Sequence, residues 1–444
     1  MRHVLYISYY FPPSGGSGVQ RTLKFVKYLP EYGWLPHVLT VDPASAAYPD
    51  LDPAMEREVP ENVVVTRTRS WDPYRWYGAL TGKSKADAVS VGFLSDRPPG
   101  RFERVARWVR ANLFIPDARV GWVTYAIRAA RVVVEAQRPD VIVTTGPPHS
   151  SHLIGRSLHR SYGIPWVADF RDPWSDIDYL GSLPMSGWAS RLNRGLEQSV
   201  LDEAQCVVAV SPAVQRAFAG RTSTPCVTLY NGYDESDFAQ EPHAAAGHFV
   251  ITHVGNMNAD RNPRALWEAL ATLRIPGVEV RLVGHVDASV RRDVEHMGLA
   301  SQVSYLPYVP HREAVRHMLG AHVLLLPVNR VSAANDIIPG KVFEYLAARK
   351  PILALGPTEG ETAQIVREAG AGQVFDYDDA AGVTSTLLAW AKQWQAGRAL
   401  EGATRDAASR FNRRIQAGDL AALLTRFAAP LPERSPGSLR AESL

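Results

Sequence analysis

Short apolar runs alternate with stretches of helical periodicity along most of the chain. The first run, Val4–Ser8, has the length of a strand, and after a loop apolar residues recur every three or four positions from Val19 to Leu29. A second strand is predicted at Pro36–Val41. Strands that alternate with helices are typical of a parallel sheet covered by helices on both faces.

The same pattern continues and predicts an α/β fold in two parts. Between them, the polar and alanine-rich stretch Glu235–His248 is typical of a linker. We therefore expect two doubly wound parallel-sheet domains, 1–230 and 231–404, a helix over 405–427 that packs back on the first domain, and a flexible tail at 428–444. The further strands are expected at Glu61–Thr68, Asp140–Thr144, Ile164–Ala168, Cys206–Val210, Val227–Tyr230, Phe249–Val254, Val278–Val283, Val303–Leu306, Val323–Leu326, Ile352–Leu355 and Gln373–Phe375.

One segment interrupts the alternation. Residues Ser70–Gly100 are rich in Pro, Gly, Asp and Ser and predict an insertion or loop. The stretch from Arg101 to Arg110 follows, with apolar residues on one helical face and arginines elsewhere. Two interpretations stay open: a helix lying on an anionic membrane surface, or a helix packed on the sheet with its arginines in solvent.

Composition agrees with a two-domain globular protein. The chain has 444 residues, more than one core usually covers, with 46% hydrophobic and 21% charged residues. A net charge of +3 gives no argument for a nucleic-acid partner. Two cysteines allow neither a disulfide framework nor a metal spacing. Without a signal peptide or an apolar run of membrane-spanning length, we expect a cytoplasmic protein, with peripheral contact at the inner membrane face left open.

Glycines and polar residues follow the strands of the first half, where parallel sheets bind ligands. Gly15, Gly16 and Gly18 precede a helix and allow close approach of the backbone to an anion. His149 follows the strand at Asp140–Thr144, although His152 is a rival and a lone histidine is more often structural. Two further candidates at strand ends are Asp172, which a turn or helix cap would also explain, and Asn231.

The second half repeats this arrangement. Gly255, Asn256 and Arg261 follow its first strand, and His285 follows the next. The strand at Val323–Leu326 leads to Asp336, to Pro339 and Gly340, which open a helix, and then to Lys341 and Glu344. Locally, an ordinary strand-loop-helix junction with a solvated charge pair explains the last group equally well.

These motifs resemble those of the retaining GT-B glycosyltransferases of family 4, over nearly the whole chain. In that family two acids with seven residues between them flank the donor, and Asp336 and Glu344 have this separation, followed by the usual Tyr-Leu-Ala. Asp336 stands where the family normally has glutamate. Gly255 and Arg261 match the phosphate loop, in which Asn256 replaces a basic residue.

The resemblance implies a function and roles for the residues. It implies a hexosyltransferase of bacterial cell-surface glycan biosynthesis that retains configuration and moves a sugar from a nucleotide-diphosphate sugar to a glycan or lipid-linked acceptor. Glu344 would bind the donor ribose, and Arg261 with Lys341 would neutralise the diphosphate. His149 would lie near the reacting sugar, Gly15 and Gly16 near donor and acceptor, and Asp172 on the acceptor side. No cofactor and no metal would be required, and no Asp-x-Asp motif occurs at a strand end.

Other functions remain open at this point. A nucleotide-sugar 2-epimerase of the same fold would need no acceptor site. A nucleotide-sugar binding protein without activity is conceivable because of Asn256 and Asp336. A nicotinamide-dependent dehydrogenase lacks support, since the spacing of Gly15, Gly16 and Gly18 is not Gly-x-Gly-x-x-Gly.

Overall fold

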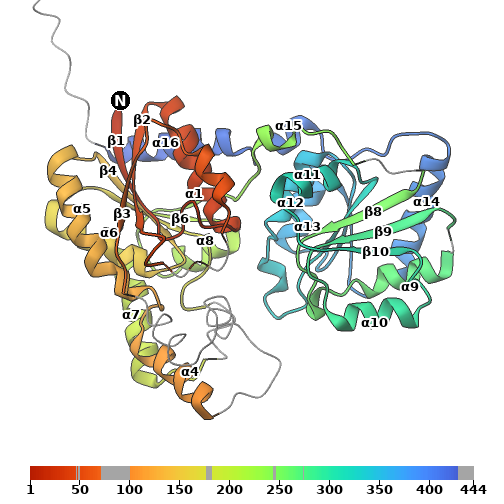
Figure 1. The fold of residues 1–444 in the computed structure, drawn as a ribbon, viewed down its shortest axis with the longest axis horizontal. Helices are drawn as coiled ribbons and strands as arrows, with labels where there is room; N and C mark the ends of the chain where they lie inside the picture. Colours follow the sequence, from red (N-terminus) through yellow and green to blue (C-terminus); the bar gives the residue numbers. More distant parts are fainter. Residues whose placement is uncertain are drawn as a thin grey trace, which may run out of the picture.

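The computed structural model describes residues 1–46, 48, 51–71, 101–176, 183–243, 247–273 and 275–428. The insertion expected at Ser70–Gly100 and the tail expected at 428–444 lie almost entirely outside these residues. Two parallel sheets with helices on their faces lie side by side (Figure 1), which confirms the prediction of two doubly wound domains.

The first sheet is built from the amino-terminal half. Its strand order is β3-β2-β1-β4-β5-β6-β7, and all the pairs are parallel. The order reverses between β1 and β4, so the loops that follow these two strands diverge to opposite faces and leave a crevice at the sheet edge. The strands are β1 (Arg2–Ile7), β2 (Trp34–Val41), β3 (Val64–Thr68), β4 (Val141–Gly146), β5 (Trp166–Phe170), β6 (Cys206–Ala209) and β7 (Cys226–Thr228).

The second sheet has the same topology with one strand fewer. Its order is β10-β9-β8-β11-β12-β13, again all parallel, and it reverses between β8 and β11. The strands are β8 (Phe249–Val254), β9 (Val278–Val283), β10 (Val303–Leu306), β11 (Val323–Pro327), β12 (Ile352–Leu355) and β13 (Gly372–Phe375).

Helices cover both faces of each sheet because the strands are apolar on both sides. In β1, Leu5 and Ile7 belong to one buried cluster, whereas Val4 and Tyr6 belong to another on the opposite face. Around the first sheet lie α1 (Ser17–Tyr28), α5 (Val123–Gln137), α6 (Ser150–Tyr162), α7 (Gly187–Glu203) and α8 (Pro212–Ala219), while α4 (Arg101–Leu113) contacts α7 below the sheet in Figure 1. Around the second lie α9 (Arg264–Leu273), α10 (Ala288–His296), α11 (His311–Leu319), α12 (Lys341–Ala348), α13 (Glu361–Glu368) and α14 (Ala380–Gln395). No helix within the described ranges is both long and apolar enough to cross a bilayer.

The chain ends by returning to the first half. Residues 405–427, expected as one helix, form α15 (Arg405–Ser409) and α16 (Arg413–Phe427). The break has a local cause: the side chain of Asn412 accepts a hydrogen bond from Arg414 N and so caps a new helix. Helix α16 then packs against α1 at the top of the first domain in Figure 1.

A buried ion pair joins helix α1, the first sheet and the segment after β7, where the chain leaves the first domain. Arg21 of α1 contacts Asp169 of β5 through Nη2 at 2.8 Å and Nε at 3.0 Å, and both side chains are buried. The same guanidinium donates to the carbonyl oxygens of Leu229 and Tyr230, at 2.9 and 2.8 Å. The charge is thus paired and its donors are satisfied, as a buried arginine requires.

Replacing Asp169 by Asn should destabilise the protein strongly. The substitution leaves Arg21 buried without its counter-ion, and breaking a buried pair in this way costs about 3–5 kcal/mol. Urea unfolding followed by circular dichroism measures the loss. The matched control is Glu31→Gln, which removes the carboxylate from an exposed ion pair with Arg414 and should leave the unfolding midpoint unchanged. Equal effects of the two substitutions would contradict the role given to the buried pair.

Candidate active site

A cleft of about 900 Å³ opens where the carboxyl ends of the two sheets face one another. Its walls come from loops that follow β1, β5 and β7 of the first sheet and β8 and β11 of the second, which includes both points of strand reversal. Most of the residues expected from the sequence line it. They are Gly15, Gly16, Asp172, Asn231, Gly255, Asn256, Arg261, Asp336, Pro339, Gly340, Lys341 and Glu344. Gly18, His149 and His285 are not among the lining residues.

The loop after β8 forms the cationic corner of this cleft. Gly255 has a φ of 109°, and a Cβ atom there would lie 2.8 Å from Lys341 Nζ. The positive φ favours glycine at this position, and a larger residue would also displace the Lys341 ammonium group. Although Lys341 belongs to α12, far along the chain, its amine packs directly on this loop.

Lys341 lies in surroundings that disfavour its charge. Burial and the positive charge of Arg261 lower its pKa to about 7, against the opposing effect of Glu344. Its Nζ lies 3.4 Å from His253 Nε2, while His253 Nδ1 lies 3.0 Å from the carbonyl oxygen of Leu325. Since a carbonyl only accepts, Nδ1 carries the proton and Nε2 is free to accept from Lys341.

Arg261 is held in place beside Lys341 by polar contacts. Its Nε donates to Asn329 Oδ1 at 2.7 Å, and its Nη1 donates to the carbonyl oxygen of Asn256 at 3.2 Å. Asn329 in turn donates to Asp260. Burial lowers the pKa of Arg261 from its ordinary value, and Asp260 opposes the shift. Two cations thus converge on one loop, an arrangement that an anion would stabilise.

Glu344 faces the same cleft from the first turn of α12. Its Oε1 lies 2.8 Å from Nε2 of His311, the first residue of α11. Burial alone would lower the pKa of His311, but the hydrogen bond and charge of Glu344 outweigh it and raise the pKa above its usual value. The contact with His311 therefore fixes the orientation of the Glu344 carboxylate.

Asp336 lies on the rim of the cleft. It ends the short 3-10 helix Ala334–Asp336 and is exposed, with its backbone N–H donating to the carbonyl oxygen of Ala333. Pro339 and Gly340 separate it from α12, so Asp336 and Glu344 reach the cleft from two different elements. The two acids are thus brought to one cleft but not onto one helix.

The opposite wall is formed by the first sheet. Gly15 and Gly16 follow β1, and Gly16, with a φ of 96°, precedes α1. Gly18 lies behind this wall, where a Cβ atom would lie 1.9 Å from Nη1 of Arg171. The glycine thereby lets Arg171 cross over the start of α1 and line the cleft beside Asp172. Burial raises the pKa of Asp172, against the charge of Arg171.

His149 and His285 do not line the cleft. The ring of His149 is 5% exposed and stacks on Trp174, with ring centroids 4.9 Å apart. Neither of its ring nitrogens has a hydrogen-bond partner, and burial, with the charges of His152 and Arg171, lowers its pKa well below the usual value. His285 is exposed.

Two residues of the cleft have no recognisable signal in the sequence. His311 precedes Glu344 by 33 positions and only the packing of α11 on α12 brings them together. Arg413, the first residue of α16, lines the cleft, although it follows the second domain in the sequence and its helix packs on α1 of the first. Its Nη1 is buried and has no hydrogen-bond partner, and burial, followed by the charge of Arg21, lowers its pKa to about 10.

Both halves of the chain match models of known protein families, and the whole chain is similar in fold to solved structures. The model described as "Glycosyl transferase 4-like domain" matches residues 16–232, and "Glycosyl transferases group 1" matches residues 234–405. No curated protein sequence matches.

The similar structures include a sucrose-phosphate synthase from Thermosynechococcus elongatus, with 16% identity, a TM-score of 0.60 and coverage of 96% of this chain and 99% of that chain. Anabaena HepE in complex with UDP has 17% identity, a TM-score of 0.59 and coverage of 96% and 100%. An α,α-trehalose-phosphate synthase (UDP-forming) from Burkholderia vietnamiensis has 13% identity, a TM-score of 0.59 and coverage of 96% and 98%. At these identities the likeness concerns the fold.

The low pKa of Lys341 is directly measurable. In protein with ¹³C-labelled lysine, one resonance should titrate near pH 7, and Lys341→Arg should remove it. Arg261→Gln removes a positive neighbour and should raise this pKa, whereas Glu344→Gln removes a negative one and should lower it. If no lysine titrates below about pH 9.5, the Lys341 amine is not buried beside Arg261 as described.

Proposed function

We propose that this chain, a glycosyltransferase of GT-B fold, transfers a hexosyl group from a nucleoside-diphosphate sugar to a glycan or lipid-linked acceptor with retention of configuration. The observation that carries the proposal is the pair of cations, Arg261 and Lys341, beside the Gly255 loop. A diphosphate bound there would stabilise both charges and would raise the pKa of Lys341, so its binding would take up a proton at pH 8.

The donor would lie along the second sheet. Its diphosphate would contact Arg261, Lys341 and the backbone at Gly255, while Glu344, oriented by His311, would accept hydrogen bonds from the ribose hydroxyls. Asp336 on the rim would contact the donor sugar. That Anabaena HepE and the Burkholderia synthase have UDP or a UDP-forming reaction in their names supports a nucleotide of this kind.

The acceptor would approach from the first sheet. Arg171, Asp172 and the glycines at 15 and 16 line that wall, and they leave the anomeric carbon of the donor between the two halves. In the transfer, the bond from the anomeric carbon to the β-phosphate oxygen breaks and the bond to the acceptor oxygen forms on the same face. The acceptor proton passes to the leaving diphosphate, and Arg261 and Lys341 stabilise its developing charge. These cations supply the charge for which other glycosyltransferases use a metal, so we propose that the reaction needs none.

Binding of nucleotides tests the donor site. We expect at least one nucleoside diphosphate to raise the thermal midpoint of the protein, because ligands that bind only the folded state stabilise it. Arg261→Ala should weaken diphosphate binding about 10- to 100-fold, the loss of a charge-assisted contact of about 1.5–3 kcal/mol, but should change binding of the matching nucleoside little. Glu344→Ala should weaken the nucleoside as well.

The control is Arg398→Ala, which removes an exposed arginine outside the cleft. Equal losses for nucleoside and diphosphate in the Arg261 variant would argue against a phosphate role. With the donor identified, retention of the anomeric configuration in the product, followed by NMR, distinguishes the proposed reaction from inversion.

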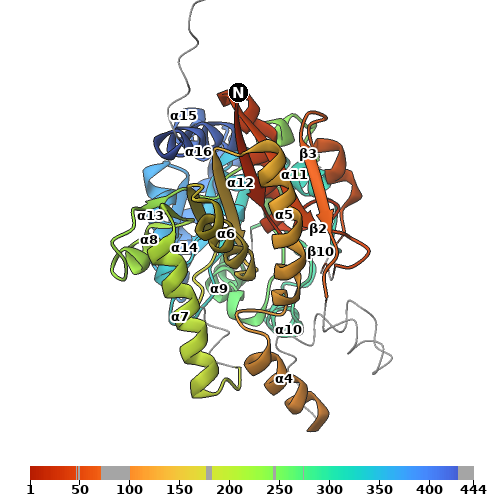
Figure 2. The same ribbon diagram turned by 90° about the vertical axis from the view of Figure 1, so that its left-hand side faces the viewer.

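We also propose that α4 and the start of α7 bind an anionic membrane surface, which would bring a lipid-linked acceptor to the cleft. These two helices lie together at the end of the first half, away from the second (Figure 2). On α4, Val105 is 62% and Trp108 49% exposed, and on α7 Trp188 is 64% exposed. Asn112 joins the helices by accepting from Ser186 N at 2.7 Å.

Charge complementarity supports a membrane as the partner of this apolar surface. Arg104 on α4, and Arg191 and Arg194 on α7, are exposed beside it. Basic side chains that surround exposed tryptophans suit the boundary between acyl chains and anionic headgroups. Of the two interpretations of the Arg101–Arg110 stretch, the exposure of its apolar side chains favours the membrane.

Vesicle flotation tests this surface. The protein should float with vesicles containing phosphatidylglycerol and remain behind with neutral phosphatidylcholine. Replacing Arg104, Arg107 and Arg110 by Glu, or Trp108 and Trp188 by Ser, should reduce the floated fraction at least about fivefold, since each basic residue near such a surface contributes about 1 kcal/mol. The matched control carries the same charge change at exposed positions of the other half, Arg292, Lys392 and Arg398. Equal release by the control variant would show that net charge alone is responsible.

A further inference from the structure

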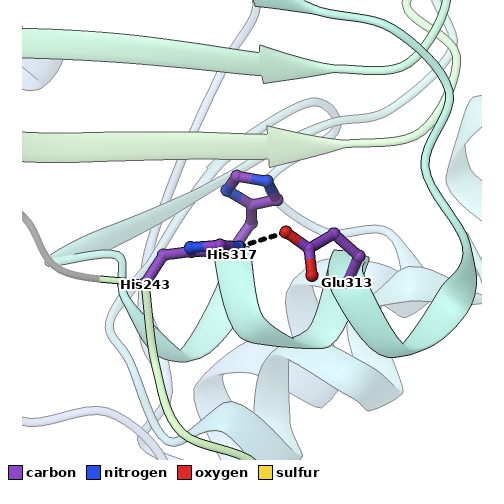
Figure 3. A group of neighbouring side chains, drawn as sticks. All are labelled: His243, Glu313 and His317. Atoms are coloured by element: carbon purple, nitrogen blue, oxygen red, sulfur yellow. Dashed lines mark hydrogen bonds and ion pairs between the residues drawn. The ribbon is translucent and has the colours of Figure 1, made fainter.

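A second cluster of chemically active side chains lies away from the cleft, where the linker between the two sheets crosses α11. His243 belongs to that linker, and Glu313 and His317 lie one turn apart on α11, so both point from the same face of the helix (Figure 3). The backbone of the linker is fixed there, because His243 N donates to the carbonyl oxygen of Arg316 at 3.1 Å. A Cβ atom added at Gly320 would lie 2.1 Å from the carbonyl oxygen of His243, so only glycine fits there.

The three side chains lie close together. Nε2 of His243 contacts Glu313 Oε1, and the rings of His243 and His317 stack with their centroids 4.2 Å apart. One nitrogen or oxygen of each residue lies within 4.8 Å of the others. His317 is only 8% exposed, and its Nδ1 is buried without a hydrogen-bond partner. A buried imidazole nitrogen with no partner is costly unless a ligand satisfies it.

We propose that His243, Glu313 and His317 bind one Zn²⁺ ion, with solvent in the fourth position. Two imidazoles and one carboxylate are a ligand set that zinc accepts at about 2.0–2.2 Å in tetrahedral geometry. Such geometry brings ligand atoms to about 3.3 Å from one another, so small rotations of the side chains must close the cluster. Glu313 borders a hollow beside the linker, from which an ion and its water would enter.

The surroundings favour zinc over a hard cation. Two of the three ligands are imidazoles, which suit zinc. Arg316 donates to Glu313 Oε2 at 3.2 Å and so orients the carboxylate from behind. With a single carboxylate, the group offers too few oxygen ligands for Ca²⁺ or Mg²⁺.

Another group of possible ligands consists of three carboxylates and already holds a cation. Glu58, Asp234 and Asp237 also have closely spaced carboxylates, but the ammonium group of Lys24 lies among them, 2.5 Å from Glu58 and 2.8 Å from Asp234. Lys24 already provides the cation there.

An ion at this site would act on the architecture and not on the reaction directly. It would tie the linker to α11, whose first residue, His311, orients Glu344. Metal binding would thereby stabilise the path of the chain between the two halves. This inference does not depend on the nature of the donor or acceptor.

Calorimetric titration with ZnCl₂ tests the site in full-length protein that carries no polyhistidine tag and has been freed of metal with chelator. We expect one equivalent to bind, the thermal midpoint to rise, and Co²⁺ to give the visible absorption of a tetrahedral nitrogen- and oxygen-ligated ion. His243→Gln and His317→Ala should each weaken Zn²⁺ binding more than about tenfold. Mg²⁺ and Ca²⁺ should leave the thermal midpoint unchanged.

The matched control is His296→Ala, which removes an exposed histidine on α10 and should bind Zn²⁺ like the original protein. Because His243 is in the linker and partly exposed, its variant tests the site even if His317→Ala fails to fold. Unchanged binding in the His243 variant, equal losses in the His296 control, or an equal response to Mg²⁺ would each overturn the proposal.

Discussion

The buried contact between Arg21 and Asp169 is the constraint on which the arrangement of the molecule depends. One guanidinium joins α1, the end of β5 and the carbonyl oxygens of Leu229 and Tyr230, where the chain leaves the first sheet. Helix α1 begins directly after Gly15 and Gly16, which line the cleft. The same contact therefore fixes these glycines relative to the segment at Leu229 and Tyr230. Helix α16 adds to this by packing on α1 while its first residue, Arg413, faces the cleft. The wall of the site and the path of the chain between the domains are therefore set by one group of interactions.

The opposite corner of the cleft is held in an electrostatically unfavourable state. Arg261 and Lys341 lie close together with burial acting against both charges, and Glu344 compensates only in part while it also holds His311. The folded protein maintains this arrangement because the second sheet and the positive φ of Gly255 fix the loop on which Arg261 and Lys341 meet. A site organised in this way needs little rearrangement when an anionic ligand arrives, as the proposed stabilisation of a leaving diphosphate requires.

The two halves also contact each other directly across the cleft. Glu361, the first residue of α13, accepts from the backbone N–H of Ala213 on α8 at 2.5 Å and from Arg216 at 3.3 Å. Together with the linker on α11 and the return of α16, this contact limits the positions that the second half adopts relative to the first. Since donor and acceptor would approach from different halves, such contacts affect how closely the reacting groups meet.

The sequence by itself determined the class of fold and the edges of the sheets that form the cleft. Short apolar runs separated by helical periodicity admit few alternatives to parallel doubly wound sheets, and polar residues after such strands must gather at their carboxyl ends. Gly255, Arg261, Lys341 and Glu344 were found for this reason. Tertiary structure alone decided which of these side chains reach the cleft. His149 follows a strand as expected but turns into the aromatic cluster around Trp174, because the direction of a side chain at a loop depends on the packing of the next helix. Contacts between segments distant in sequence, which no local pattern encodes, bring His311 to Glu344 and Arg413 to the cleft. Such contacts also bring His243 to Glu313 and His317 on α11.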